Sequence, residues 1–221
     1  NRYTRRSQKP LSASSWEFKS PPEHTMSYYR TQPLSQNKKL RAYIIGVALG
    51  DGNLSNPNGR AVRLRITCDK KYPLLIKHIT SRLASLLPKN KIGVINRKTC
   101  VDISAYSNHW ETLLWKCGGG PKDEQNVSVP QWVKKNKTYT KESLRGLLQT
   151  DGSLYQDRNY TMVNFVNTTP ALSKNVFTMM QNLGYHPNMQ KFKQKNGKIK
   201  HTIRVSKNVE KFIREVDLWK K

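Results

Sequence analysis

The sequence predicts an α+β fold made of two similar halves within one chain. Residues 44–52 read IIGVALGDG and residues 144–152 read LRGLLQTDG, so one pattern returns after one hundred residues. Other positions keep the same spacing, for example Ile103 with Ile203. This period is too long for a solenoid repeat, and it indicates two domain-sized copies.

The composition favours a polyanionic partner. The chain of 221 residues carries 40 basic and 14 acidic residues, a net charge of +26 that attracts polyanions. No apolar run reaches the roughly 20 residues that a membrane helix needs. Cys68, Cys100 and Cys117 are odd in number and widely spaced, which indicates a reducing compartment. With no hydrophobic signal region at the start, we expect an intracellular protein, in bacterial or archaeal cytoplasm or in an organelle, not a secreted one.

The first 35 residues differ from the rest, because they are rich in Arg, Lys, Ser, Pro and Gln and show no sustained periodicity. One interpretation is a disordered or irregular basic arm. The other is an arm that lies on a nucleic-acid backbone through Arg2, Arg5, Arg6, Lys9 and Arg30. The predicted division is an arm at 1–35, a first half at 36–120, a linker at 121–135 and a second half at 136–221.

The first half begins with an expected helix over residues 37–50. Residues 60–67 alternate between apolar and polar side chains, which predicts a half-buried strand. Leucines and isoleucines at helical spacing then predict an amphipathic helix over 72–87. A hairpin with strands at 91–97 and 99–106 follows, and a short helix over 108–117 ends the half.

The second half repeats this order. We expect a helix over 141–150, and strands at 153–157 and 160–167. A helix over 170–183 precedes a second hairpin, whose strands span 189–194 and 198–206, and Asn196-Gly197 is a strong turn signal between them. A last helix over 208–219 closes the chain. Each half is therefore predicted to be α-β-β-α-β-β-α.

The repeated pattern contains small residues at helical spacing. Gly46 and Gly50 stand four apart, and Gly146 with Thr150 repeats this arrangement. Glycine inside a helix costs about 1 kcal/mol relative to alanine. Small residues let two helix backbones approach closer than the usual spacing of roughly 8–10 Å. We therefore expect the two helices to pack against each other around a pseudo-twofold axis.

Such packing brings Asp51 and Asp151 to the same end of the molecule. Each alone fits an ordinary Asp-Gly turn at a helix end. Together they place negative charge at two helix C-termini, which already carry partial negative charge. A divalent cation resolves this conflict, because carboxylates, backbone carbonyls and waters are the oxygen ligands that Mg²⁺ prefers.

With these motifs the chain resembles the LAGLIDADG homing endonucleases in their monomeric, two-motif form, over roughly residues 37–219. The departure from the family pattern is the first acidic position, which is Leu49 in one copy and Gln149 in the other. The resemblance implies that each half presents a four-stranded antiparallel saddle sheet to the DNA major groove. It also implies that the motif helices form the central interface, with both acids under the minor groove.

The resemblance further implies a metal-dependent endodeoxyribonuclease that hydrolyses one phosphodiester on each strand and leaves short 3′ overhangs. The metals would be held by Asp51, Asp151 and the carbonyls of Gly50 and Thr150. Mg²⁺ is the expected ion, while Mn²⁺ or Ca²⁺ would take the same sites and Ca²⁺ would not support cleavage. Around the attacking water the family places a polar residue and a lysine in each half, which correspond here to Asp69, Asn167 or Thr169, Lys122, and Lys220 or Lys221.

Outward polar residues of both halves form the expected DNA-reading surface, since arginine suits guanine edges and lysine suits phosphates. A strong salt dependence of binding is expected. The candidates are Asn53, Ser55, Asn56, Asn58, Arg60, Arg63, Arg65, Thr67, Arg97 and Lys98 in the first half, and Ser153, Tyr155, Gln156, Arg158, Asn159, Lys191, Lys193, Lys195, Lys198, Lys200 and Arg204 in the second.

Three functions stay open from the sequence. The first is a site-specific endonuclease, acting as a monomer without an obligate protein partner on a long asymmetric duplex target. The second is an RNA maturase of the same architecture, because the net charge suits RNA equally well. The third is a DNA-binding regulator without cleavage, which predicts a lost acid or an added helix-turn-helix segment, and the sequence shows neither.

Overall fold

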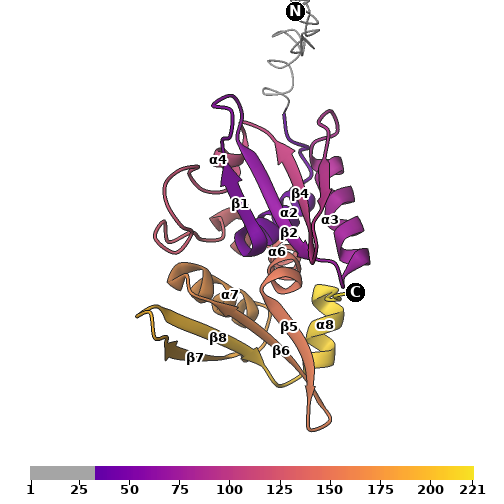
Figure 1. Cartoon of the computed structure of the whole chain (residues 1–221). Helices are drawn as coiled ribbons and strands as arrows, with labels where there is room; N and C mark the ends of the chain where they lie inside the picture. Colours follow the sequence, from indigo (N-terminus) through magenta and orange to yellow (C-terminus); the bar gives the residue numbers. More distant parts are fainter. Residues whose placement is uncertain (1–32) are drawn as a thin grey trace, which may run out of the picture.

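The computed structural model describes residues 33–221, which form two halves that meet along a central pair of helices (Figure 1). Each half contains one four-stranded antiparallel sheet together with its helices. The α+β architecture of two αββαββα halves is therefore confirmed. The proposed basic arm, with Arg2, Arg5, Arg6, Lys9 and Arg30, lies outside the described residues apart from its last three positions.

The first half follows the predicted order closely. Asn37 caps the first helix, because its side chain accepts a hydrogen bond of 3.1 Å from the backbone N–H of Leu40. Pro73 stands at the start of the next helix, where its missing N–H costs nothing. The elements are α2 (Lys38–Asp51), β1 (Gly52–Ser55), β2 (Arg63–Asp69), α3 (Pro73–Leu86), β3 (Gly93–Asn96), β4 (Cys100–Tyr106) and α4 (Trp110–Leu113).

In the second half the motif helix begins four residues earlier than predicted, because Asn136 caps it by accepting from the N–H groups of Thr138 and Tyr139. The short helix α5 (Gln131–Lys134) precedes it in the linker. The remaining elements are α6 (Lys137–Thr150), β5 (Gly152–Asp157), β6 (Tyr160–Asn167), α7 (Pro170–Asn182), β7 (Asn188–Lys193), β8 (Ile199–Val205) and α8 (Val209–Val216). The strand orders, β1-β2-β4-β3 and β5-β6-β8-β7, are equivalent.

The two motif helices, α2 and α6, pack together at the centre of the molecule (Figure 1). A Cβ placed on Gly146 would lie 2.5 Å from the carbonyl oxygen of Tyr43, and one on Gly46 would overlap the carbonyl of Ser143. Only glycine fits at these two positions without a backbone shift. The close helix contact predicted from the repeated pattern is thus present.

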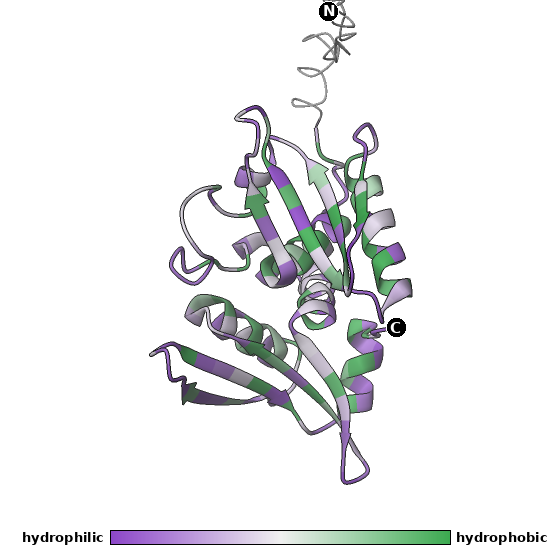
Figure 2. Ribbon diagram, in the orientation of Figure 1, coloured by the Kyte–Doolittle hydropathy of each residue, from purple (hydrophilic) through white to green (hydrophobic). Residues whose placement is uncertain are grey.

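Each half has its own hydrophobic core, between the inner face of its sheet and its helices. Figure 2 shows the strands alternating between hydrophobic and hydrophilic residues, as expected for sheets with one open face. Two segments depart from this separation. Val127 and Val129 of the linker belong to the core of the second half, while Trp219, near the C-terminus, packs against the core of the first half.

Two predicted helices are shorter in the structure. The helix expected over 108–117 is reduced to α4, and α8 ends at Val216 because Asp217 adopts a left-handed conformation. Residues 217–221 therefore leave the helix, and the C-terminus lies at the boundary between the halves, beside α3 and α8 (Figure 1). Among the described helices, none combines the length and apolar character required to cross a membrane.

Candidate functional site

The two acids of the repeated motif lie together where α2 and α6 end. Asp51 is the last residue of α2, and Asp151 is the C-cap of α6. A Cβ placed on Gly50 would lie 3.6 Å from the Cγ of Asp151, so the acid of one half reaches the motif of the other. Both carboxylates therefore lie at two adjacent helix C-termini, where the helix dipoles are unfavourable to them.

This arrangement raises the pKa of both acids. Protein surrounds the Asp51 carboxyl closely, although one side of it stays open to solvent, and this partial burial raises its pKa to about 6, with a smaller contribution from the charge of Asp151. Burial also raises the pKa of Asp151, while a hydrogen bond from Asn167 and two nearby lysines act in the opposite direction. The two lysines thus compensate the charge of the carboxylates only in part, and a divalent cation would supply further positive charge.

Lys122 and Lys220 reach the site from the linker and from the C-terminal segment. The Nζ of Lys122 donates to the carbonyl of Leu49, at 2.8 Å, and to that of Gly50. The Nζ of Lys220 donates to the carbonyls of Thr150 and Gly152 at 2.9 and 3.0 Å. Burial lowers the pKa of both lysines, and the two acids oppose this effect.

Two of the predicted metal ligands are the carbonyls that these lysines contact. The carbonyls of Gly50 and Thr150, expected to coordinate metal, accept hydrogen bonds from Lys122 and Lys220. Each carbonyl oxygen has a second lone pair, so it can also serve a cation. Among the described residues no group of three His, Cys, Asp or Glu side chains could hold a metal. The donor set still fits a hard divalent ion, because its oxygens are two carboxylates and two carbonyls.

The polar residues expected beside the acids differ between the halves. Asn167, at the end of β6, donates from Nδ2 to Oδ2 of Asp151 at 2.7 Å. Thr169, the alternative position, is buried and donates its backbone N–H to Asn167. Asn167 is therefore the residue that contacts the acid of the second half.

Asp69, expected to correspond to Asn167 or Thr169, does not occupy the strand position equivalent to Asn167. Gly52 pairs with Ile66 in the first sheet as Gly152 pairs with Phe165 in the second. The residue two positions further along the strand is Cys68 in one half and Asn167 in the other. Because side chains alternate along a strand, Asp69 points to the opposite face from Cys68.

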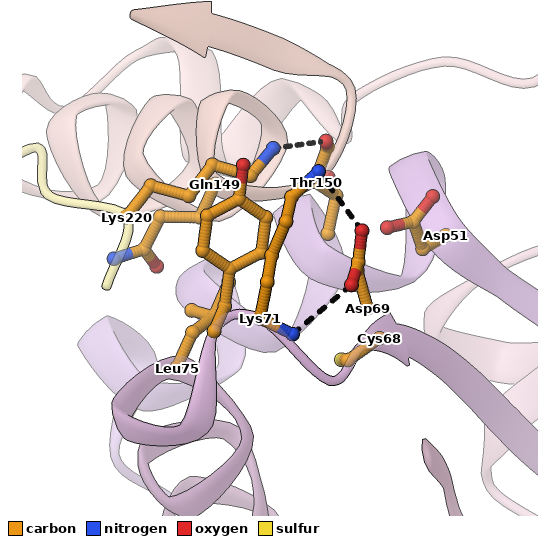
Figure 3. Close-up of a pocket in the computed structure, with 9 residues that line it drawn as sticks. Asp51, Cys68, Asp69, Lys71, Leu75, Gln149, Thr150 and Lys220 are labelled. Atoms are coloured by element: carbon orange, nitrogen blue, oxygen red, sulfur yellow. Dashed lines mark hydrogen bonds and ion pairs between the residues drawn. The ribbon is translucent and has the colours of Figure 1, made fainter. Parts of the chain in front are cut away.

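Asp69 nevertheless borders the site. It is exposed and forms an ion pair with Lys71, with 2.9 Å between Oδ2 and Nζ, and this contact lowers its pKa. A cavity of about 190 Å³ lies beside Asp51 (Figure 3). Its lining combines residues of both halves: Asp51, Cys68, Asp69, Lys71, Tyr72, Leu75, Gln149, Thr150 and Lys220.

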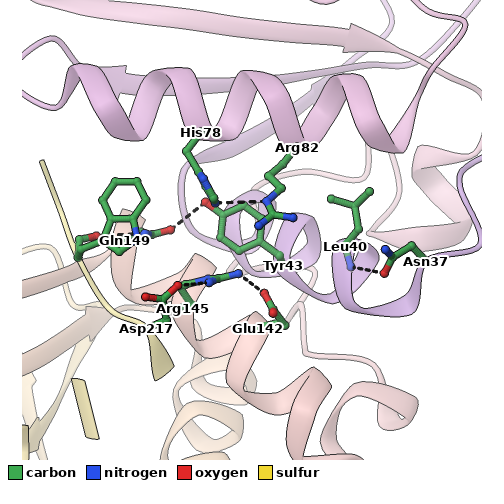
Figure 4. A network of polar contacts seen from close by, with 10 residues as sticks. Asn37, Leu40, Tyr43, His78, Arg82, Glu142, Arg145, Gln149 and Asp217 are labelled. Carbon is green, nitrogen blue, oxygen red and sulfur yellow. Dashed lines mark hydrogen bonds and ion pairs between the residues drawn. The ribbon is translucent and has the colours of Figure 1, made fainter. Parts of the chain in front are cut away.

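Sequence reasoning missed a polar network behind the site (Figure 4). Gln149 accepts from the hydroxyl of Tyr43 at 2.8 Å and donates to the carbonyl of Trp219 at 3.0 Å. It thus links the first half, the second motif helix and the segment that carries Lys220. The sequence signal for this network was Gln149 itself, which occupies the first acidic position of the motif. A buried amide needs a donor for its oxygen and an acceptor for its nitrogen.

The same network contains a buried arginine. Arg145 of α6 pairs with Asp217 at 2.5 Å and with Glu142, and its guanidinium lies 5.1 Å from the ring centre of Tyr43. It therefore ties the base of the C-terminal segment to the helix interface. Nothing in the spacing of the motif predicts these partners, which come from the C-terminal segment as well as from α6.

In the first half the predicted reading residues of β1 and β2 share one open sheet face. Asn53 and Ser55 of β1 pair with Arg65 and Arg63 of β2, and Ser55 accepts a hydrogen bond from Arg63 at 3.1 Å. Thr67 follows on the same face. Arg97 and Lys98 lie in the turn between β3 and β4, whereas Asn56, Asn58 and Arg60 lie in the loop between β1 and β2.

Asp102 was not predicted as a site residue but lies on this face. It accepts from Thr67 at 2.7 Å and pairs with Arg97 at 2.5 Å. These contacts lower its pKa although burial opposes the change. An ionised acid on a basic surface therefore fixes two of the predicted reading side chains.

In the second half Ser153, Tyr155, Lys200 and Arg204 share the open face, and Asn164 links Tyr155 to Arg204 with bonds of 3.0 and 3.2 Å. Arg158 and Asn159 form the turn between β5 and β6, both with positive φ. Lys195 lies in the turn between β7 and β8, and Lys198 adjoins it.

Gln156, Lys191 and Lys193, also predicted to read DNA, lie on the sheet face opposite to the other candidates. Gln156 alternates with Tyr155 and bonds to Thr161 on the opposite face. Lys191 and Lys193 pair with His201 and Ile199, whereas the residues of β8 on the open face are Lys200 and Arg204. Lys191 and Lys193 do lie on one face of β7, as predicted. Their pairing with His201 and Ile199 places that face opposite to the one that carries Lys200 and Arg204.

Two family models match the chain, one in each half. Residues 139–217 match a LAGLIDADG-like domain, and residues 40–108 match the WhiA LAGLIDADG-like domain. No protein among the curated ones matches significantly.

Solved structures show the same two-domain fold. The crystal structure of I-DmoI in complex with DNA and Mn has a TM-score of 0.61 and 19% identity, covering 81% of this chain and 96% of that one. A variant of I-DmoI with its target DNA and Mg has a TM-score of 0.60 and 17% identity, with the same coverage. The N-terminal LAGLIDADG domain of DUF199/WhiA has a TM-score of 0.56 and 10% identity, covering 89% of this chain and 92% of that one. I-DmoI is described as a homing endonuclease.

Proposed function

This chain is a LAGLIDADG protein of the single-chain, two-domain type, and we propose that it is a site-specific endonuclease that cuts both strands of duplex DNA with a divalent metal. The observation that supports this most is the pair of acids, Asp51 and Asp151, at adjacent helix ends. Each acid has a lysine at the carbonyls of its own motif. A chain that only bound DNA would have no need of this concentration of buried charge.

Asp51 and Asp151 would hold the metal together with the free lone pairs of the Gly50 and Thr150 carbonyls. Bound there, a divalent cation would activate water and neutralise charge on the scissile phosphates. Mg²⁺ is the expected physiological ion, and I-DmoI, of the same fold, has been crystallised with DNA and Mn, Mg or Ca.

The side chains around the acids have separate roles in this proposal. Asn167 holds the carboxylate of Asp151 in one orientation through its hydrogen bond. Lys122 and Lys220 lie beside the carboxylates and would attract the phosphates that approach the site. The open sheet faces would lie in the major groove, with Arg63, Arg65, Arg204 and Lys200 among the contacts.

The two open faces carry different side chains, so we propose that the target is a long asymmetric duplex. Arginines dominate the face of β2, whereas Tyr155 and Asn164 occupy the corresponding part of the second sheet. The net charge of +26 adds affinity for the phosphate backbone that falls steeply as salt is added.

The test is in vitro selection for cleavage from a randomised duplex library, once with Mg²⁺ and once with EDTA. We expect one long site, cut only with metal and leaving 3′ overhangs. Asp51→Asn and Asp151→Asn should each lower the cleavage rate by at least about 100-fold while duplex affinity is retained, because one metal-binding carboxylate is lost. Glu210→Gln, an exposed acid on α8, is the matched control and should cut normally.

Residues 40–108 match the WhiA LAGLIDADG-like domain, whose description names no nuclease activity. The second candidate is therefore the DNA-binding regulator without cleavage that the sequence left open. Selection of a bound site that is not cut with any divalent metal would favour it. Preferential binding of structured RNA over duplex DNA would instead favour an RNA-maturase role.

A further inference from the structure

The segment that carries Lys122 is attached to the opposite half. Lys122 donates to carbonyls of the first motif, but the next residue, Asp123, pairs with Lys198 of the second half at 2.6 Å. Further along, the Asn126 side chain accepts from the backbone N–H of Ala171 at 3.1 Å. The backbone N–H of Val129 then donates to Asn175 of α7 at 2.8 Å.

The segment that carries Lys220 shows the reciprocal arrangement. Lys220 donates to carbonyls of the second motif, but the carbonyl of Lys221 accepts from the backbone N–H of Leu75 in the first half at 3.0 Å. The ring of Trp219 packs edge-on against His78 of α3, with 5.2 Å between centroids. The Nζ of Lys220 itself lies 5.2 Å from the ring centre of Tyr72, also in the first half.

From these contacts we infer that the two site lysines are positioned crosswise. Lys122, in the linker after the first half, serves the first motif, and Lys220 serves the second, yet in each case a contact with the opposite half helps to hold the lysine there. Asp123 is the positioning residue for Lys122, and Tyr72 is the positioning residue for Lys220. The inference rests on the proposed nuclease function, because it assigns the two lysines to two strand cuts.

The physical reason is entropic. A lysine side chain on a free segment would lose considerable rotamer freedom each time it reached its carbonyl. Anchoring the neighbouring backbone restricts that freedom in advance, so the ammonium group is in place before DNA binds. Each lysine also has contacts within its own half, because the Nζ of Lys122 lies 5.5 Å from the ring centre of Trp115 and Gln149 bonds to the carbonyl of Trp219. Docking of the halves through α2 and α6 adds the crosswise anchors to these contacts.

The test measures the rate of cutting of each strand separately, under single turnover, on the site selected above. Lys122→Met and Lys220→Met provide the reference strand preferences. Asp123→Asn removes the ion pair without changing the size of the side chain, and it should slow the strand that depends on Lys122 by about threefold more than the other strand. Glu210→Gln is again the control for the loss of one negative charge.

Tyr72→Leu removes the ring beside Lys220 and should produce the opposite preference, also by about threefold. Tyr72→Phe keeps the ring and should restore the parent ratio of strand rates.

A general loss of stability would slow both strands equally, so the ratio separates positioning from damage to the fold. Equal slowing of both strands by Asp123→Asn or by Tyr72→Leu would overturn the inference and leave the nuclease function intact. A parent chain that cuts neither strand would instead overturn the proposed function, and this inference with it.

Discussion

The two halves are alike where they touch each other and unlike where each surrounds its acid. At the helix interface Gly46 and Gly146 meet equivalent backbone atoms of the opposite helix. Beside the acids, Asn167 contacts Asp151, whereas its counterpart near Asp51 is the buried thiol of Cys68. The shared interface fixes where the acids lie, and residues one layer away can then differ without disturbing the fold.

This difference gives the two acids different partners. Asp151 has a hydrogen bond from Asn167 that favours its charged form, whereas burial and the charges of Asp151, Lys122 and Lys220 act on Asp51. A buried thiol is a weak hydrogen-bond donor. The first half therefore offers its carboxylate less support than the second, and under the proposed function the two strands should be cut at unequal rates.

The largest expected effect is on stability, and it tests the helix interface at which the two halves are alike. Gly146→Val should lower the free energy of unfolding by about 3 kcal/mol, because the added side chain meets the carbonyl of Tyr43. Gly46→Val should cost a similar amount, and urea unfolding would measure both. Gly197→Val serves as the comparison. Gly197 has a positive φ and nothing lies within 4 Å of its Cβ position, so this variant adds backbone strain without a steric clash. If the interface variants cost no more than Gly197→Val, the close helix contact is not essential.

An exchange of the unlike residues tests the difference itself. Asn167→Cys should slow the strand served by the second half by about tenfold, since a hydrogen bond to a charged group contributes roughly 1.5–3 kcal/mol. Cys68→Asn should raise the cleavage rate of the other strand, though by a smaller factor, because the residues around Cys68 are packed against a thiol and not against an amide. Strand-resolved cleavage assays measure both changes. If Asn167→Cys left the ratio of strand rates unchanged, the amide would have no part in the asymmetry.

The smallest effect concerns stability and pH. The pKa of Asp51 is raised from its ordinary value of 3.8 to about 6, so between these values the folded protein holds the proton more tightly than the unfolded chain does. Stability therefore falls as the pH rises through this window. Asp51→Asn should stabilise the protein at pH 7.5 by about 1 kcal/mol, after allowance for solvent screening on the open side of the carboxyl.

At pH 4 the two proteins should be almost equally stable, because Asp51 is then largely protonated in the folded state. Thermal unfolding at both pH values, without divalent metal, measures this difference. An equal effect of Asp51→Asn at pH 4 and pH 7.5 would show that the charge is not responsible. Added Mg²⁺ should reduce the advantage of the variant at pH 7.5, since binding to the folded state stabilises the parent protein.

The sequence by itself determined the duplication, the order of the elements and the two acids. These features depend on local rules: glycine at helical spacing, alternation in strands and an Asn-Gly turn act within a few residues of the chain. Lys122 and Lys220 also followed from the resemblance, although the linker length left Lys220 and Lys221 as alternatives.

Only the tertiary structure decided which residues face the acids. Strand pairing makes Cys68, and not Asp69, the counterpart of Asn167, and it turns Lys191 and Lys193 away from Lys200 and Arg204. A shift of one residue in pairing moves every side chain of a strand to the other face. That pairing, like the crosswise anchoring of the lysines and the bonds of Gln149, depends on contacts between residues distant in the chain, which no local pattern specifies.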